Sequence, residues 1–184
     1  ANSISVGNND TAFVAGNLSS VTAGMGFAHG IYASAIRFNQ YTHGGNFNFL
    51  ASGGGAQFVR LLAGIKTTDA TPTKLSLDTT TTLYAAVTSG NIMFLDIKIV
   101  GILSTGASAC CYKRKVAIKN VGGTTALVGT VETIGTDIED NVACDVAITA
   151  DDTNDALQIS VTGIAAETWR WMAVIEGVEM KYGT

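Results

Sequence analysis

A 14-residue repeat between Phe13 and Gly44 constrains the fold more than any other feature of the sequence. An aromatic residue followed three positions later by glycine occurs at Phe13–Gly16, Phe27–Gly30 and Tyr41–Gly44. Fourteen residues are too few for the common helical repeats, but they suit one coil of a narrow β-solenoid, built from two short strands and two turns. The repeat therefore predicts a β-solenoid stalk in residues 1–65, with the aromatic residues stacked as a ladder and the glycines at tight corners.

A solenoid this narrow has little room for a core. Strand residues advance by about 3.3 Å each, so a coil of this size encloses only a thin slot of side chains. The only charged residues in residues 1–65 are Asp10, Arg37 and Arg60, and a nearly uncharged apolar surface usually marks a contact site. We therefore expect several copies of the chain to pool their cores, as an obligate homotrimer.

The composition changes near Lys66, where a second domain, residues 66–184, is expected to begin. This part of the chain alternates apolar runs with turn residues and shows no helical periodicity. In the last run, Trp169 and Trp171 share one face and Arg170 takes the other. Strands are expected at residues 73–77, 79–87, 92–103, 107–119, 124–133, 142–150, 157–162 and 168–180, with a connecting strand at 56–65. The sequence thus predicts an all-β protein, a short trimeric β-solenoid or β-roll stalk followed by an antiparallel, jelly-roll-like β-sandwich.

Charge and hydropathy argue against two classes of partner. The net charge of −4 does not favour nucleic acid, because phosphate binding needs a clustered basic face. No apolar run approaches the ~20 residues that a membrane-spanning helix needs, and the N-terminus has no basic and apolar regions typical of a signal peptide. We expect neither nucleic-acid binding nor membrane insertion.

His29 and His43 are the most prominent candidate ligands, since they occupy the same position of successive repeats. In a trimer they could form two rings of three imidazoles, and imidazole is a common metal ligand. Ala15 holds the same position without a ligand atom, which favours packed or exposed polar positions instead. We assign no metal ion and no cofactor from the sequence.

Two acidic segments invite a catalytic or a calcium-binding interpretation. Asp137, Glu139 and Asp140 could include the carboxylate pair of a glycosidase, but no aromatic residues accompany them, which favours a solvated loop. The segment Asp151–Asp155 lacks the glycine and the distal glutamate of an EF-hand loop, which favours a hairpin turn. The chain also has no G-x-S-x-G motif. We therefore expect no enzyme and assign no catalytic, cofactor-binding or receptor-binding residues.

The three cysteines do not form a recognisable disulfide or zinc pattern. Cys110 and Cys111 are adjacent in a predicted strand and so point to opposite faces, while Cys144 stands apart. They are interpreted as small, mostly buried thiols of a chain assembled in a reducing compartment. A bridge from Cys144 to one of the other two stays open.

Two families resemble parts of the chain. The 14-residue coils resemble the left-handed β-roll heads of trimeric autotransporter adhesins. Four later segments resemble, in the same order, the C-terminal domain of tailed-bacteriophage tail fibres and tailspikes: Thr67–Thr71, Gly122–Leu127, Asp151–Leu157 and Thr168–Glu176. The second resemblance implies a trimeric virion protein with a β-helical shaft and a β-sandwich that supports trimerisation or contacts the host.

The leading hypothesis is therefore a phage tail fibre or tailspike, located in the virion and assembled in the host cytoplasm. It would trimerise and attach to a receptor on the bacterial cell surface, with a glycan favoured over a protein. Two alternatives stay open: the non-catalytic C-terminal part of a polysaccharide-degrading tailspike, and the head of a bacterial trimeric adhesin. The resemblance transfers no receptor-binding residue.

Overall fold

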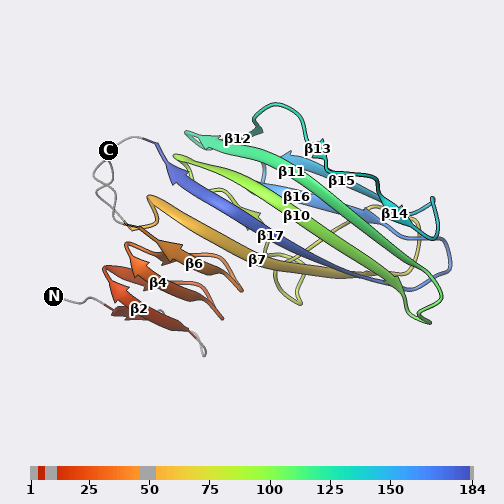
Figure 1. Cartoon of the computed structure of the whole chain (residues 1–184), viewed down its shortest axis with the longest axis horizontal. Helices are drawn as coiled ribbons and strands as arrows, with labels where there is room; N and C mark the ends of the chain where they lie inside the picture. The colour runs from red at the N-terminus through yellow and green to blue at the C-terminus, as the bar shows by residue number, and fades with distance from the viewer. Residues whose placement is uncertain (1–3, 7–11, 46–52, 183–184) are drawn as a thin grey trace.

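The protein is all-β, as predicted. The computed structural model describes residues 4–6, 12–45 and 53–182, and within these ranges every regular element is a strand. None of the described residues belongs to a helix that could cross a membrane. The molecule is elongated, with short N-terminal strands at one end and long strands forming a sandwich at the other (Figure 1).

The N-terminal strands form a solenoid with the predicted period. Strands β2 (Phe13–Asn17), β4 (Phe27–Ile31) and β6 (Tyr41–Gly44) pair in parallel, and Phe27 stands in register with Phe13 and Tyr41. The other side of the coils carries β1 (Ile4–Val6), β3 (Ser19–Val21) and β5 (Ser34–Ala35), also parallel. Each step from one strand to its neighbour advances the sequence by 14–15 positions, as one coil requires.

Small side chains and tight corners explain how such a short coil closes. The enclosed slot is filled by Val21, Ala28, Ala33 and Ala35, all buried. A Cβ on Gly30 would lie 2.3 Å from the Gly44 carbonyl oxygen, so only glycine allows these backbones to approach so closely. Two corners per coil have positive φ at non-glycine residues, repeated one coil apart: Leu18 and Tyr32, and Met25 and Asn39. The predicted thin slot is confirmed, and so is the close backbone approach at the glycines, but these glycines lie within the strands and non-glycine residues form the corners.

The sandwich consists of two sheets that enclose one apolar core. The larger sheet is built on four long antiparallel strands, in the order β7 (Ala56–Thr67), β17 (Trp169–Lys181), β10 (Asn91–Leu103) and β11 (Ala109–Val121). Three short strands pair with the other side of β11: β12 (Thr124–Leu127), β13 (Glu132–Thr133) and β14 (Ile138–Glu139). The smaller sheet contains β15 (Asp145–Asp151), β16 (Ala156–Thr162), β8 (Thr73–Lys74) and β9 (Ala85–Ala86). It lies behind the long strands in Figure 1.

Trp169 and Trp171 share one face, as the alternation in the last strand predicts, and of the two places expected for that face, the core or a contact between chains, it takes the core of the sandwich. Their rings stack with centroids 5.6 Å apart, and both side chains are buried. The indole Nε1 of Trp171 donates a hydrogen bond to Thr67 Oγ1 at 3.0 Å. Arg170 faces outward and is exposed.

The strand expected at residues 73–77 ends at Lys74 as β8, and two longer predicted strands are interrupted. Residues 79–87 yield only β9, because the Asp78 carboxylate accepts hydrogen bonds from the backbone N–H groups of Thr80, Thr82 and Leu83 and so holds this segment in a turn. Residues 124–133 divide into β12 and β13, with Gly129 at a φ of 77° between them. The prediction of continuous strands was wrong in both places.

Stalk and sandwich share one continuous sheet. The last solenoid strand, β6, pairs antiparallel with β7, so that Tyr41 stands opposite Arg60 and His43 opposite Phe58. Lys66, where the composition changes, lies one residue before the end of β7, and β7 pairs with β17 along its whole length. The domain division expected at residue 66 stays a prediction.

Candidate functional site

The outer face of the large sheet is the most unusual surface of the molecule. Along β7, β10 and β17 the residues that face the core are buried, but most residues on the opposite side are apolar as well. Eight large apolar side chains on this outer face are between 37% and 55% exposed: Phe58, Leu62, Phe94, Val100, Ile102, Met172, Val178 and Met180. Exposed apolar surface on this scale marks an interaction site.

Strand register places part of this set in one row. Phe94, Val178 and Phe58 stand directly opposite one another on three adjacent strands. They border a hollow of about 540 Å³ that Ile92 and Met180 also line. Sequence reasoning missed this face, although the sequence carries a signal for it: apolar residues occupy both faces of strands 92–103 and 168–180, whereas a solvated face would be polar.

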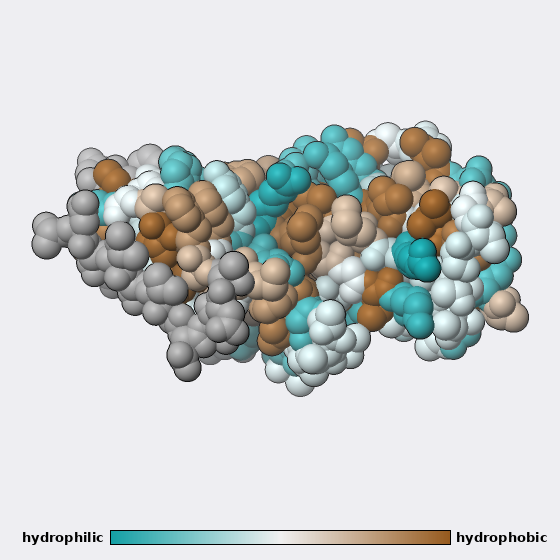
Figure 2. Space-filling model, turned by 90° about the horizontal axis from the view of Figure 1, so that it is seen from below, coloured by the Kyte–Doolittle hydropathy of each residue, from teal (hydrophilic) through white to brown (hydrophobic). Residues whose placement is uncertain are grey.

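The apolar surface continues from the sandwich onto the stalk. Phe13, Phe27 and Tyr41 form the predicted ladder, with adjacent ring centroids 4.6 and 5.0 Å apart and ring planes 11° and 12° from parallel. The ring of Tyr41 then meets Phe58 of β7 edge-on at 6.3 Å. Seen from below, apolar groups lie on the stalk and at several places along the sandwich, with polar groups among them (Figure 2).

A charged cluster interrupts the outer face. Glu176 of β17 lies between Lys98, at 2.9 Å, and Arg60, at 3.8 Å. The hydrogen bond from Lys98 lowers the pKa of the Glu176 carboxyl, against the opposing effect of partial burial. Tyr41, Arg60, Glu176 and Asp96 share one row across the strands, so this row divides the apolar surface of the sandwich into two patches.

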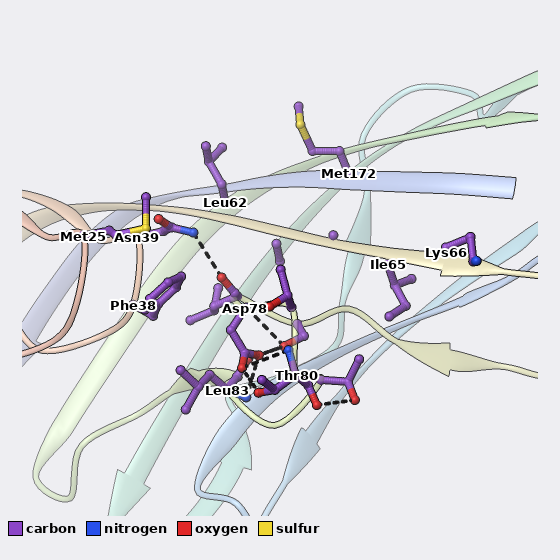
Figure 3. Close-up of a pocket in the computed structure, with 16 residues that line it drawn as sticks. Met25, Phe38, Asn39, Leu62, Ile65, Lys66, Asp78, Thr80, Leu83 and Met172 are labelled. Atoms are coloured by element: carbon purple, nitrogen blue, oxygen red, sulfur yellow. Dashed lines mark hydrogen bonds between the residues drawn. The ribbon is translucent and has the colours of Figure 1, made fainter. Parts of the chain in front are cut away.

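A groove of about 890 Å³ opens between the stalk and the loop after β8 (Figure 3). Met25 and Phe38 of the stalk, Leu62 of β7 and Leu83 of the loop supply apolar walls. Asp78 is the acidic residue in this lining, but its carboxylate is turned to its own loop. Burial raises the pKa of the Asp78 carboxyl, and hydrogen bonds from Ser76, Thr80 and Leu83 outweigh that effect and hold the pKa well below its ordinary range. Among the described residues that line the groove, Asp78 is thus the one carboxyl group, and its own loop holds it.

Asp137, Glu139 and Asp140, the candidate glycosidase acids, each have a different hydrogen-bond partner in β11. Asp137 forms a two-fold hydrogen-bonded ion pair with Arg114, at 2.5 and 2.8 Å, which lowers the pKa of the Asp137 carboxyl. Glu139 accepts a hydrogen bond from Tyr112 Oη at 2.6 Å, and Asp140 accepts one from the Ala109 N–H at 2.8 Å. Each carboxylate fastens the segment around β13 and β14 to a different residue of β11.

The second acidic segment forms the predicted hairpin turn. Residues 152–155 connect β15 to β16, which pair antiparallel. Asp151 accepts hydrogen bonds from Lys74 Nζ, at 2.8 Å, and from the side chain of Asn154. Asp155 has a φ of 47° and accepts a hydrogen bond from Thr125 Oγ1. These contacts tie the turn to β8 and β12.

His29 and His43 lie side by side on the outer face of the stalk, as their spacing predicts. Their ring centroids are 4.2 Å apart, and His43 Nδ1 lies 2.9 Å from His29 Nδ1. Ala15 continues the row on the next strand. Among the described residues no third histidine, cysteine or acidic side chain joins the pair.

Cys110 and Cys144 are buried and Cys111 is half-buried, and all three are free thiols. Burial and the neighbouring Cys110 thiol raise the pKa of the Cys144 thiol. This agrees with the prediction of small, mostly buried thiols.

Comparisons with known proteins give structural likeness only. No family model matches the chain, and no curated protein matches it. Among solved structures it is similar to the tailspike protein gp49 of Acinetobacter baumannii bacteriophage Fri1, a capsular polysaccharide depolymerase, at 10% identity and a TM-score of 0.39 over 92% of this chain and 36% of that one. The tailspike protein of Acinetobacter baumannii phage AM24 has the same identity and TM-score, over 86% and 33% of the two chains. The chain thus spans about a third of the length of the tailspikes to which it is similar.

Proposed function

We propose that this chain is an assembly and attachment module of a phage tail fibre or tailspike, in which copies of the chain associate through the outer face of the large sheet. The observation that carries the proposal is the exposed apolar surface of the outer face, in which the contact between Tyr41 and Phe58 connects the aromatic ladder of the stalk to the row of Val178 and Phe94. A monomer in water would leave both parts of this surface solvated, and burying each large side chain is worth about 1.5–3 kcal/mol.

The proposed assembly is a homotrimer. Three copies around one axis can each cover the outer face of a neighbour, and such a ring closes without leaving an unmatched apolar face. Stalk and sandwich belong to one sheet, so both would contribute to the same interface. An assembly of this kind resists dissociation, because no chain can leave without exposing apolar surface on its neighbours.

The proposed role is structural and adhesive, without catalysis by the described residues. Asp137, Glu139 and Asp140 support this view, because each carboxylate is engaged with β11. Three identical copies on one fibre would convert weak binding to a bacterial surface glycan or protein into useful avidity. The free, buried thiols of Cys110 and Cys144 suit assembly in the reducing cytoplasm of the host before the virion is released.

The native mass of the purified chain, measured by light scattering across a dilution series, tests the proposal. We expect three times the chain mass of 19.0 kDa, unchanged on dilution. Phe94→Lys should lower the mass to that of one chain, since a charge would be buried in the interface. Val142→Lys is the matched control, because Val142 is 86% exposed and lies outside the large sheet. A wild-type monomer would contradict the proposal.

A further inference from the structure

The contact between His29 and His43 joins two successive coils of the solenoid through ring nitrogen atoms. His43 Nδ1 lies 2.9 Å from His29 Nδ1 and 3.2 Å from His29 Nε2. The two residues stand in register on adjacent parallel strands, and their contact lies at the surface, where an ion in solution can reach it. Without a ligand, an N–H of one ring donates a hydrogen bond to the other.

The same separation fits a shared metal ion. Imidazole binds Zn²⁺ with a metal–nitrogen bond of about 2.0–2.1 Å. At that bond length, two nitrogens are about 2.9 Å apart when the angle at the metal is 90° and about 3.3 Å apart when it is tetrahedral. The observed separations, 2.9 and 3.2 Å, match this range.

We propose that His29 and His43 chelate one divalent transition-metal ion of the Ni²⁺, Cu²⁺ or Zn²⁺ class. Neutral imidazole is a preferred ligand of these ions, whereas Mg²⁺ and Ca²⁺ prefer oxygen. Metal binding breaks the hydrogen bond between the rings. The ring that donated this bond moves its proton to its other nitrogen, so that each ring has one nitrogen with a free lone pair facing the ion. These two lone pairs bind the ion. Water completes the coordination, because Phe27 and Tyr41, the nearest rings, offer no strong ligand.

The ion would act as a cross-link between coils. It would connect β4 to β6, and β6 is the strand that joins the stalk to the sandwich. An ion that binds only the folded chain raises stability in proportion to the logarithm of its concentration above Kd. His43 also lines the hollow beside Phe58 and Phe94, so the site borders the proposed interface, and Ni²⁺ binding by the Phe94→Lys variant tests the site apart from the assembly.

Calorimetric titration of tag-free, assembled protein with NiCl₂ near neutral pH tests the site. We expect one ion per chain for the wild type and no comparable binding of MgCl₂. His29→Gln and His43→Gln should each weaken Ni²⁺ binding by about tenfold or more, because the second ligand of a chelate binds intramolecularly. Tyr41→Phe is the matched control on the same face of β6 and should leave the Kd unchanged.

A gain-of-ligand variant provides an independent readout. Ala15 stands in register with His29 on β2, so Ala15→His would add a third imidazole to the row and should tighten Ni²⁺ binding by about tenfold. In the wild type, bound Cu²⁺ should give an electron paramagnetic resonance spectrum with two nitrogen ligands. Ni²⁺ binding that survives either His→Gln substitution, or no binding by the wild type, would overturn the proposal.

Discussion

Arg37 and Glu179, which are 142 positions apart in the sequence, form a buried ion pair between the stalk and the sandwich. Arg37 Nη1 and Nη2 lie 3.0 and 2.5 Å from the two carboxylate oxygens, and the side chains are 2% and 0% exposed. Gln57 and Asn91 donate two further hydrogen bonds to the same carboxylate, at 2.9 and 2.8 Å. The turn after β5 is thereby fastened to β7, β10 and β17.

Removing one partner of this pair should be strongly destabilising. Arg37→Met leaves the Glu179 carboxylate buried without its counter-charge, and we expect a loss of about 3–5 kcal/mol in the free energy of unfolding. Arg60→Gln is the control, because the Arg60–Glu176 pair is exposed and such pairs contribute about 0–1 kcal/mol. Urea unfolding at one fixed chain concentration measures both, and equal losses in the two variants would contradict a special role for the buried pair.

The same carboxylate predicts loss of stability in acid. Burial raises the pKa of the Glu179 carboxyl, but the Arg37 charge and the hydrogen bonds lower it by more, so the pKa lies below its ordinary value of 4.5. The ionised form therefore stabilises the fold: the contribution is complete above pH 4.5 and is lost as the pH falls through the folded-state pKa. We expect the Tm of the wild type to fall in this acidic range.

Glu179→Gln should separate this contribution from that of other acids. Hydrogen bonds from Arg114 and Lys74 also lower the carboxyl pKa values of Asp137 and Asp151. Because these two acids remain in the variant, its Tm should also fall in acid. The variant should be less stable than the wild type at neutral pH, with a shallower decline of Tm below pH 4.5. Parallel Tm profiles for the two proteins would show that Glu179 does not titrate as argued.

Features that repeat or alternate could be predicted from the sequence. The 14-residue repeat predicted the register of Phe13, Phe27 and Tyr41 and the close backbone approach at the glycines, because every coil has the same geometry. The expected place of these glycines, at corners, was wrong, since they lie within the strands. Alternation predicted the long strands β10 and β17 and the shared face of Trp169 and Trp171, which the structure places in the core. In both cases the repeat length of the sequence pattern equals the repeat length of the structure, 14 residues for a coil and two residues for a strand.

Features that depend on pairing between distant segments could not be predicted. Glu179 lies on the same face of β17 as Trp169 and Trp171, but the sequence does not show that its counter-charge comes from Arg37, which is 142 positions away. Residues 79–87 have strand-like composition, but the Asp78 carboxylate accepts hydrogen bonds from the backbone N–H groups of Thr80, Thr82 and Leu83. These groups are therefore not free to pair with a neighbouring strand. The contact between His29 and His43 lies between these cases: spacing predicted that they are adjacent, but the 2.9 Å separation needed the structure.

Glycine at position 30 should be essential for the stalk. An alanine Cβ there would lie 2.3 Å from the Gly44 carbonyl oxygen, in a backbone with a φ of 105°. Backbone strain and overpacking each cost about 1–3 kcal/mol, so Gly30→Ala should lower the Tm markedly. Gly129→Ala is the matched control: its φ is 77°, but nothing lies within 4 Å of the added Cβ, so only strain remains. Thermal unfolding followed by circular dichroism distinguishes them, and similar losses would contradict the steric argument.

Gly101 and Trp171 should be coupled, because the indole ring occupies the space of the missing side chain. The two residues stand opposite each other on β10 and β17, and a Cβ on Gly101 would clash with the six-membered part of the ring. The backbone of Gly101 does not have positive φ, so Gly101→Ala should destabilise only by displacing Trp171, breaking its hydrogen bond to Thr67 and shifting its fluorescence to longer wavelength.

A double-mutant cycle tests this coupling directly. Gly101→Ala in the wild type should cost about 1–3 kcal/mol through overpacking. In a Trp171→Leu background the ring is absent, and the same alanine should be tolerated or even favourable, because glycine in a strand interior is itself unfavourable. We therefore expect an interaction free energy of about 1 kcal/mol or more from urea unfolding of the four proteins. Additive effects would mean that the strand moves to accommodate the alanine, and that Trp171 does not require glycine at position 101.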